Sequence, residues 1–504
     1  MRKQITLPVI NNQNTRISGT NPLPSSSGVI GTGVIGIMII GQSVDPSSKD
    51  ARYVNCFKHT VGDRIYCVKR SGLDVLETPQ VSSIGTSIMV WSGQGSGDAR
   101  ITAYGAVSSS IYNATTLIAT NNTVTTNISS RATSITETVV NNNPVLYITA
   151  LNSKGWFYDP SVSSSIMQIT DAQYPGNNSL TLAGFGAHLD GYTFQMDTRG
   201  GIWNTDLNTI SSWTATGAIN ANIYPDKGIG CVRWKQYIIG FGTESMEFFY
   251  NAGNAVGSPL TRIANMAQRI GAVSADAIVN ISDNLFFCGS TSQGGLSIYM
   301  FDGQISRVST PEIDAIMLLA GASNIKMTVL RDYGMSFVIV KAGTSQYAYC
   351  IEEKFWFVWI SHLGFVRFAA LSVGTVQVVY GVSELVTTGK TYTINPASRV
   401  FADDSQSFTA RFQIQDVDPG KGLHVSYEEV QVKADVEASS SPLDIVWSDD
   451  DYMTYSNPRT VNLSSSIPKT TRCGGTKHPR AFAATHAATT PMRVEELRMR
   501  VKIG

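Results

Sequence analysis

An aromatic hairpin recurs along the middle of the chain and constrains its fold more than any other feature. Each copy has a short apolar run, a turn rich in Gly, Ser, Thr or Asn, and a second strand that carries an aromatic residue. One aromatic per copy gives eight anchors: Tyr66, Tyr112, Tyr158, Trp203, Tyr250, Phe301, Tyr349 and Tyr392. Successive anchors are 46, 46, 45, 47, 51, 48 and 43 residues apart, the length of a four-stranded propeller blade. Since one such sheet cannot bury both faces alone, we expect the repeats to stack around an axis with the anchors in the core.

Composition favours strands over helices throughout the chain. Only 15% of the 504 residues are charged, 42% are hydrophobic, and Ser, Thr and Asn are abundant. These three are poor helix formers, whereas alternating Val, Ile, Thr, Tyr and Phe suit a pleated sheet with one buried face. The sequence therefore predicts an all-β protein with a β-propeller of six to eight blades over residues 51–400. Unrelated hairpins in a sandwich are the alternative.

The N-terminal segment differs from the repeats. Residues 28–41 are apolar and rich in Gly, and they are too short to span a bilayer. The polar residues 11–27 before them do not match a signal peptide. We therefore expect an extended N-terminal arm over residues 1–50, in which 28–41 form a buried strand or pack on a neighbouring subunit.

The C-terminal segment also loses the repeat. Residues 412–415 and 430–434 alternate between apolar and polar, as half-exposed strands do. This pattern predicts a separate, β-sandwich-like domain over residues 401–504. Residues 492–503 alternate apolar and charged side chains, which indicates either a protected edge strand or a docking surface for an acidic partner.

One local motif in this domain predicts a particular turn. Residues 448–455, Ser-Asp-Asp-Asp-Tyr-Met-Thr-Tyr, are similar to the Asp-box hairpin Ser-x-Asp-x-Gly-x-Thr-Trp of sialidases and related β proteins. Because side chains of that hairpin hydrogen-bond its turn, Ser448, Asp450 and Thr454 are predicted to be structural. A Ca²⁺ site is the alternative, but adjacent acids in a strand point to opposite faces.

No catalytic or cofactor motif is present in the sequence. The six histidines are isolated, without HExxH, GxSxG or a phosphate-binding loop, and Cys473 and His478 lack a second pair of zinc ligands. A net charge of zero argues against tight electrostatic binding of nucleic acid. We therefore expect a non-enzymatic protein without metal or cofactor. The cysteines lack CxxC spacing and are predicted to be reduced core residues: Cys56, Cys67, Cys231, Cys288, Cys350 and Cys473.

Three groups of residues together resemble a known family. Residues 52–56, Arg-Tyr-Val-Asn-Cys, and 66–73, Tyr-Cys-Val-Lys-Arg-Ser-Gly-Leu, are similar to its opening, with Ser71 in place of Pro. Residues 229–253 are similar to a blade in which an apolar strand leads through a Gly-Ser/Thr turn into Glu, two apolar or aromatic residues and Tyr. The Ser-Asp-Asp hairpin and the final strand look like its C-terminal β domain. The family is that of the packaged-DNA stabilisation proteins, or tail hub (nozzle) proteins, of short-tailed bacteriophages (podoviruses).

The resemblance implies a structural component of the virion tail, made in the host cytoplasm. Such proteins form a homo-oligomeric ring, expected here to be a hexamer, below the portal and its head-to-tail adaptor and in contact with tail fibres or tailspikes. The ring closes the DNA exit channel, stabilises the packaged double-stranded DNA without sequence-specific binding, and conducts it during ejection. We further expect flexible loops between Val81 and Asn143 to narrow the exit.

Two other classes remain open at this stage. A propeller glycosidase or sialidase acting on host surface polysaccharide would need paired carboxylates in the propeller mouth, and the sequence offers no pair that can be placed there. A carbohydrate-binding tail fibre would be a trimer with a long repetitive shaft.

Overall fold

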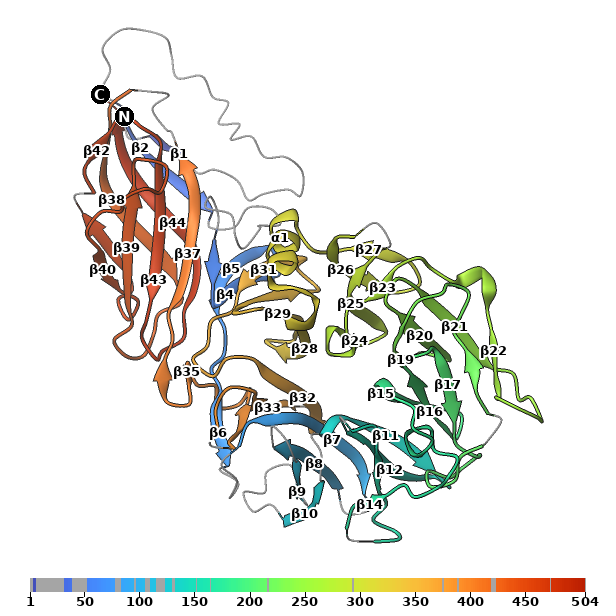
Figure 1. The fold of residues 1–504 in the computed structure, drawn as a ribbon. Coiled ribbons are helices and arrows are strands. Elements are labelled where there is room, and N and C mark those ends of the chain that lie inside the picture. Colours follow the sequence, from blue (N-terminus) through green and yellow to red (C-terminus); the bar gives the residue numbers. More distant parts are fainter. Residues whose placement is uncertain are drawn as a thin grey trace. The chain divides into compact units, whose positions relative to one another are not determined.

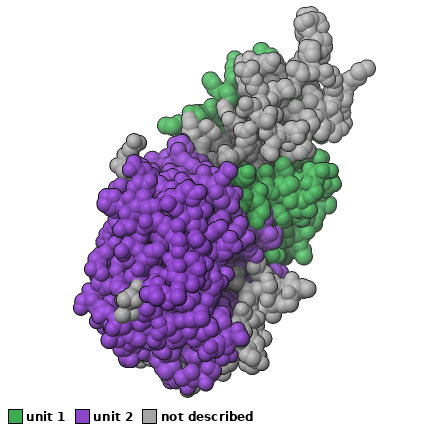
Figure 2. Space-filling view, turned by 90° about the vertical axis from the view of Figure 1, so that its right-hand side faces the viewer, with its two compact units in different colours: residues 1–73, 347–360, 399–504 green, residues 74–346, 361–398 purple. Residues whose placement is uncertain are grey.

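The computed structural model describes most of the chain and divides it into two compact units, coloured separately in Figure 2. Unit 1 comprises residues 1–73, 347–360 and 399–504, and unit 2 comprises residues 74–346 and 361–398. The described residues are 3–5, 31–38, 52–77, 83–94, 97–104, 109–114, 123–128, 132–150, 152–163, 165–214, 217–291, 294–373, 376–387, 389–417, 423–471 and 473–503.

Unit 2 consists of successive antiparallel sheets, each built from strands that follow one another in the sequence. The first contains β7 (Gly85–Gln94), β8 (Gly97–Tyr104), β9 (Ser109–Ala114) and β10 (Thr123–Ile128). The second contains β11 (Ala132–Val140), β12 (Asn143–Ala150), β13 (Gly155–Tyr158) and β14 (Met167–Gln168). The third contains β15 (Leu182–Leu189), β16 (Tyr192–Asp197), β17 (Gly201–Asn204) and β18 (Ile219–Asn220).

The remaining sheets of unit 2 repeat this pattern with three variations, in the fifth, sixth and seventh sheets. The fourth contains β19 (Gly228–Trp234), β20 (Tyr237–Gly242), β21 (Met246–Asn251) and β22 (Leu260–Arg262). In the fifth, β23 (Gly271–Ala272) and β24 (Ile278–Ile281) both pair with β25 (Asn284–Ser290), followed by β26 (Leu296–Phe301) and β27 (Ile305–Arg307). The sixth is represented in unit 2 by β28 (Ile325–Asp332) and β29 (Met335–Ala342). The seventh contains β32 (Val366–Val373), β33 (Val376–Ser383), β34 (Thr391–Ile394) and β6 (Asp74–Glu77).

These seven sheets form a β-propeller (Figure 1). Their inner strands, β7, β11, β15, β19, β24, β28 and β32, follow one another around the axis. The circle closes because β32 contacts β7, and because β6, which precedes β7 in the chain, pairs with β34 as the fourth strand of the last sheet. Joining the first and last sheets in this way avoids an open end to the array. The predicted all-β propeller is therefore confirmed, with seven blades.

The gating role of the segment from Val81 to Asn143 stays a prediction, but most of its described residues lie in strands rather than in loops. They form the four strands of the first sheet and β11. The Ser, Thr and Asn residues of this segment lie in antiparallel ladders, as the strand-favouring composition predicts.

Aromatic rings and one glycine bring neighbouring sheets of the propeller together. Trp234 of the fourth sheet packs on Phe301 of the fifth, with ring centroids 4.7 Å apart. Gly186 of the third sheet lies against the ring of Tyr147 in the second, where a Cβ would come within 2.4 Å of a ring carbon. At these two junctions, neighbouring blades thus bury a face on each other, as the repeat predicts.

Short helical segments connect the propeller strands. The α-helix α1 (Pro311–Ala320) lies between β27 and β28, with Thr310 as its N-cap, Pro311 in its first turn, and Gly321 at positive φ after its last turn. The described residues also include four 3₁₀ segments: η1 (Pro175–Asn177), η2 (Ala264–Met266), η3 (Ala275–Ala277) and η4 (Ala322–Asn324).

Unit 1 is a β-sandwich. The strand order of one sheet is β1 (Lys3–Ile5), β2 (Gly31–Met38), β44 (Arg493–Ile503), β38 (Val425–Ala434) and β41 (Lys469–Thr471). Strand β42 (Gly475–Thr476) also pairs with β38. The hairpin of β4 (Cys56–Val61) and β5 (Arg64–Lys69) joins this sheet because β5 pairs with β44. The other runs β30 (Ser345–Cys350), β31 (Phe355–Val358), β3 (Tyr53–Val54), β37 (Ala410–Val417), β43 (Arg480–His486), β39 (Pro442–Ser448) and β40 (Arg459–Asn462). Tyr427 and Phe482 pack edge-on between the two sheets at 5.6 Å. A small hairpin, β35 (Ala402–Asp403) with β36 (Gln406–Ser407), belongs to the same unit.

The division into units differs from the predicted domain boundaries in two places. The sequence assigned residues 51–400 to the propeller and 401–504 to the C-terminal domain. In the structure, residues 52–73 and 347–360 belong to unit 1, because β3 pairs with both β31 and β37. Most of the predicted 1–50 arm lies outside the described residues. The parts of it that the structure describes are the strands β1 and β2.

A buried ion pair ties together the distant segments of unit 1. Arg70 makes a bidentate pair with Asp403, with Nη1–Oδ1 at 2.9 Å and Nη2–Oδ2 at 2.5 Å, and the two residues are 1% and 0% exposed. Arg70 Nε also donates to Asn55 Oδ1 at 3.0 Å, and Asn55 Oδ1 accepts from the amide of Ile360. These bonds join four stretches of chain that are up to 350 residues apart in sequence, so the cluster specifies how unit 1 is assembled.

The surroundings of Arg70 leave little room for change. Its guanidinium carbon lies 4.3 Å from the ring centroid of Trp359 and 3.7 Å from that of Phe408. The adjacent Gly72 approaches the backbone of Ala402 so closely that a Cβ would lie 2.1 Å from the carbonyl oxygen. The opening motif of the sequence therefore has a structural explanation: it builds this cluster.

Candidate functional site

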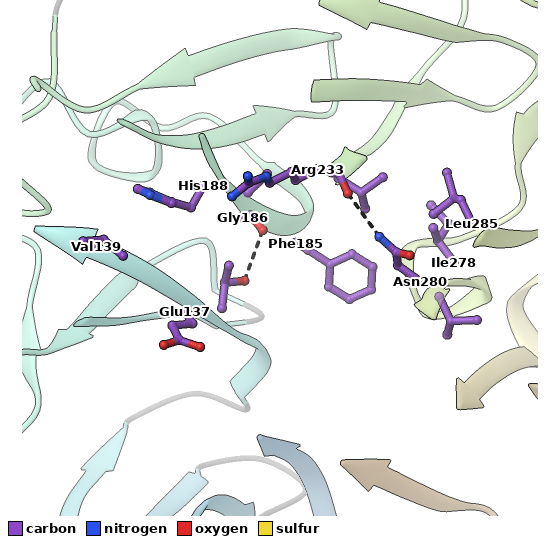
Figure 3. A pocket seen from close by; sticks show the side chains of 13 residues that line it. Glu137, Val139, Phe185, Gly186, His188, Arg233, Ile278, Asn280 and Leu285 are labelled. Carbon is purple, nitrogen blue, oxygen red and sulfur yellow. Dashed lines mark hydrogen bonds between the residues drawn. The ribbon is translucent and has the colours of Figure 1, made fainter. Parts of the chain in front are cut away.

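A pocket of about 430 Å³ opens among the inner strands of the propeller (Figure 3). Strands β11, β15, β19 and β24 of four successive sheets contribute to it, with one residue from β25. Its lining residues are Thr136, Glu137, Val139, Phe185, Gly186, Ala187, His188, Val232, Arg233, Ile278, Val279, Asn280 and Leu285. Because the inner strands of a propeller surround its central channel, this pocket lies on the channel side of four successive blades.

Three ionisable residues line the pocket. Burial raises the pKa of the Glu137 carboxyl. Burial, and then the positive charge of Arg233, lower the pKa of His188, whose Nδ1 lies 2.8 Å from Thr138 Oγ1. Arg233 Nε donates to its neighbour Lys235 O at 2.9 Å, and Asn280 Nδ2 donates to the Arg233 carbonyl at 3.3 Å (Figure 3). Each shift disfavours the charged form, as expected for partly desolvated groups.

The pocket does not match the chemistry of glycoside hydrolysis. That reaction uses two carboxyl groups, roughly 5–9.5 Å apart, as acid and as nucleophile or base. Glu137 is the single carboxylate among the thirteen residues that line the pocket. The pocket therefore lacks the pair of carboxyl groups that a propeller glycosidase requires.

A second constellation, in unit 1, has the outline of a serine–histidine pair. Ser441 Oγ lies 2.9 Å from His486 Nε2, and His486 Nδ1 lies 3.5 Å from Lys69 Nζ. All three residues are fully buried, and the third group is a cation where a catalytic triad has a carboxylate. Burial and then the charge of Lys69 lower the pKa of His486 to about 4, so its imidazole is neutral and weakly basic. This cluster is a core hydrogen-bond network.

The same cluster predicts a pH dependence of stability. The folded-state pKa of His486 is about 4, against an ordinary 6.5, so the unfolded chain binds a proton more readily between these values. Stability is therefore lost as pH falls from about 6.5 to about 4. The melting temperature of the unmodified protein should fall more between pH 6.5 and 4.5 than that of a His486→Asn variant, measured by differential scanning calorimetry.

The control for this prediction is a histidine at the surface of the same unit. His478 is exposed, so His478→Asn should keep the full pH dependence of the unmodified protein. Equal slopes in the His486→Asn and unmodified proteins would show that His486 does not titrate between the folded and unfolded states as described.

In the structure, Ser448, Asp450 and Thr454 hydrogen-bond to one another and to the backbone of their hairpin. Ser448 Oγ donates to Asp450 Oδ1 at 2.8 Å and accepts from the Tyr452 amide at 2.9 Å. Asp450 Oδ1 accepts from the Thr454 amide at 2.9 Å, and Asp450 Oδ2 accepts from Thr454 Oγ1 at 2.5 Å. These bonds lower the pKa of Asp450 to about 2. The side chains cap the turn, and the neighbouring Asp449 pairs with the buried Arg480.

Seven of the eight aromatic anchors lie on the third strand of their repeat along the chain. These are Tyr112 on β9, Tyr158 on β13, Trp203 on β17, Tyr250 on β21, Phe301 on β26, Tyr349 on β30 and Tyr392 on β34. Tyr66 differs because it lies on β5 in unit 1. The β4–β5 hairpin has the sequence pattern of the repeat but is not part of a propeller blade. Tyr250 is also not a core residue: it is 40% exposed.

In the described part of the chain, neither the cysteines nor other metal-ligating side chains form a site. All six cysteines are buried, and none forms a disulfide. Over the described ranges, no three His, Cys, Asp or Glu side chains come close enough together to hold a metal ion. Among the helices of the described part of the chain, none has the length and apolar character needed to cross a membrane.

Sequence reasoning missed the residues that line the pocket and those that form the Arg70 cluster. Glu137, His188 and Arg233 lie on three inner strands about 50 residues apart, and no local motif connects them. Their common position near the start of successive repeats was the available signal. Asp403 follows the last repeat and has no partner close in sequence, so its pairing with Arg70 could be found only from the tertiary structure.

The fold and these sites define a class: a seven-bladed β-propeller joined to a β-sandwich, with buried polar clusters that have structural roles. A family model described as "Bacteriophage P22 Gp10, beta-propeller" matches residues 104–366, just over half of the chain. The chain belongs to this family of phage stabilisation proteins and is a phage structural protein. No curated protein matches it.

One of the matching solved structures is a chain of "Crystal Structure of Mitotic Checkpoint Complex". It is 11% identical, and the match covers 64% of this chain and 94% of that chain with a TM-score of 0.38.

Proposed function

We propose that this protein is the tail hub, or nozzle, of a short-tailed phage: a ring that closes the DNA exit, retains the packaged DNA, and conducts it during ejection. The observation that carries the proposal is the family match over residues 104–366, which covers much of the propeller. The absence of a carboxylate pair from the propeller pocket also favours a structural role over a glycosidase.

The charge of the chain suits a conduit. Lys and Arg contacts to phosphates supply most of the sequence-independent affinity for DNA, and that affinity rises with each contact. This protein has 38 basic and 38 acidic residues and no net charge. A neutral wall would hold DNA by blocking its path and would let it slide once the path opens.

The proposed partners follow from this role. We expect six copies of the chain in the ring, a head-to-tail adaptor below the portal on one side, and tail fibres or tailspikes attached to it. Viral double-stranded DNA would occupy the channel without sequence-specific contacts.

DNA retention tests this function. Phage particles assembled without the protein should package DNA and then lose it, so that the DNA becomes sensitive to added nuclease. Supplying the protein from a plasmid should restore protection. Particles that lack the protein and still protect their DNA as well as complete particles would refute the role in retention.

The enzymatic alternative is tested on purified protein. Incubation with host surface polysaccharide should release no reducing sugars above the level given by a Glu137→Gln variant. Release by the unmodified protein that the variant abolishes would favour a glycosidase. A trimeric mass for the assembled protein would favour a tail fibre.

A further inference from the structure

In unit 1, strand β2 supplies most of the backbone pairing along one edge of strand β44. On its first side β44 pairs with β38 from Val494 to Ile503. On its second side β5 pairs only at Arg493 and Val494, and β2 covers the rest, from Glu496 opposite Met38 to Ile503 opposite Gly31. Without β2, eight residues of β44 would present unpaired backbone groups at the edge of the sheet.

The pairing between β2 and β44 is specified by backbone and register. The β2 sequence, Gly-Thr-Gly-Val-Ile-Gly-Ile-Met, has no charged residue. The register sets Ile35 opposite the buried Met499 and Ile37 opposite the buried Leu497. In the described part of the chain, β2 pairs only with β44 and, in parallel, with the short β1. A strand held in this way fits the β44 edge of any copy of the chain equally well.

The connection after β2 has the length and composition of a linker. Fourteen residues, 39–52, separate Met38 from Tyr53, and a chain of this length can span roughly 50 Å. Its sequence contains Gly41, Ser43, Pro46, Ser47 and Ser48, residue types common in linkers. The sequence therefore does not restrict β2 to the β44 of its own chain.

We propose that β2 is exchanged between copies, so that residues 31–38 of one subunit pair with β44 of the next. This inference rests on the proposed function, because exchange requires several copies side by side. Each subunit donates one strand and receives one, which is a head-to-tail contact that closes when the copies form a ring. Every interface then includes an eight-residue antiparallel ladder and shields the apolar β2 from solvent.

Cysteine cross-linking tests the exchange. Thr32 lies directly opposite Lys502, so Thr32→Cys with Lys502→Cys places two thiols at a spacing that a disulfide can bridge. After mild oxidation of the assembled protein, a non-reducing denaturing gel should show a ladder of covalent multimers up to the size of the ring. The six native cysteines are all buried, which keeps the background low.

A matched control shares one of these positions. Ser426 is opposite Lys502 on the other side of β44, so Ser426→Cys with Lys502→Cys should cross-link within single chains. The mass of the unoxidised assembly is measured in parallel. A ring whose Thr32–Lys502 disulfides all lie within single chains overturns the exchange and leaves the proposed hub intact. Monomers with internal disulfides overturn both.

Discussion

Replacement of Arg70 by Met is expected to lower the free energy of unfolding of unit 1 by about 3–5 kcal/mol. The loss arises because Asp403 is fully buried and would be left without its bidentate partner. Asn55 Oδ1 and the carbonyl oxygens of Ser71 and Ile360 would lose a donor as well. Urea denaturation followed by tryptophan fluorescence measures the effect, since Trp356 and Trp359 lie in unit 1.

Two further variants control for this result. Arg64 also carries an ion pair, but it is 65% exposed and 3.9 Å from Glu495, so Arg64→Met should shift the urea midpoint very little. Arg70→Met combined with Asp403→Leu removes both charges and should recover more than half of the loss. If Arg70→Met unfolds at the same urea concentration as the unmodified protein, the cluster does not hold unit 1 together.

Truncation of Tyr392 is expected to destabilise the propeller by about 3–5 kcal/mol. Tyr392 lies on β34 in the seventh sheet, is 0% exposed, and pairs with Val75 of β6, the strand that closes the circle. Removing its ring leaves a cavity at the junction of the first and last parts of the propeller chain. Thermal unfolding of Tyr392→Ala should show a propeller transition at a lower temperature.

The matched control is another anchor of the same residue type. Tyr250 occupies the third strand of the fourth sheet but is 40% exposed, so Tyr250→Ala should cost less than about 1 kcal/mol. If Tyr392→Ala and Tyr250→Ala destabilise the protein equally, the burial of Tyr392 in the seventh sheet does not determine its contribution to stability, which would contradict the fold described here.

The aromatic period predicted the propeller because seven successive repeats along the chain each place an aromatic residue on their third strand. Spacing alone could not identify the closing strand: β6, Asp-Val-Leu-Glu, has no aromatic residue and pairs with β34, more than 300 residues later. Spacing also could not show that Tyr66 lies outside the propeller. The hairpin of β4 and β5 has the same local pattern as a repeat, but β5 pairs with β44 from the C-terminal part of the chain.

The local hairpin was more predictable than the clusters. Ser448, Asp450 and Thr454 bond within seven residues of chain, so the motif contains nearly all the information needed. By contrast, Arg70–Asp403 and Lys69–His486 join residues more than 300 positions apart. The residue types alone do not identify these pairs, because the packing of the two sheets determines which buried side chains meet.

Imaging of the filled phage particle tests the central claim most directly. Cryo-electron microscopy of the tail should show six copies of this seven-bladed propeller and its sandwich arranged as a closed ring around the DNA exit, with DNA density ending at that ring. A single copy, a trimer on a fibre, or density away from the exit would contradict the account.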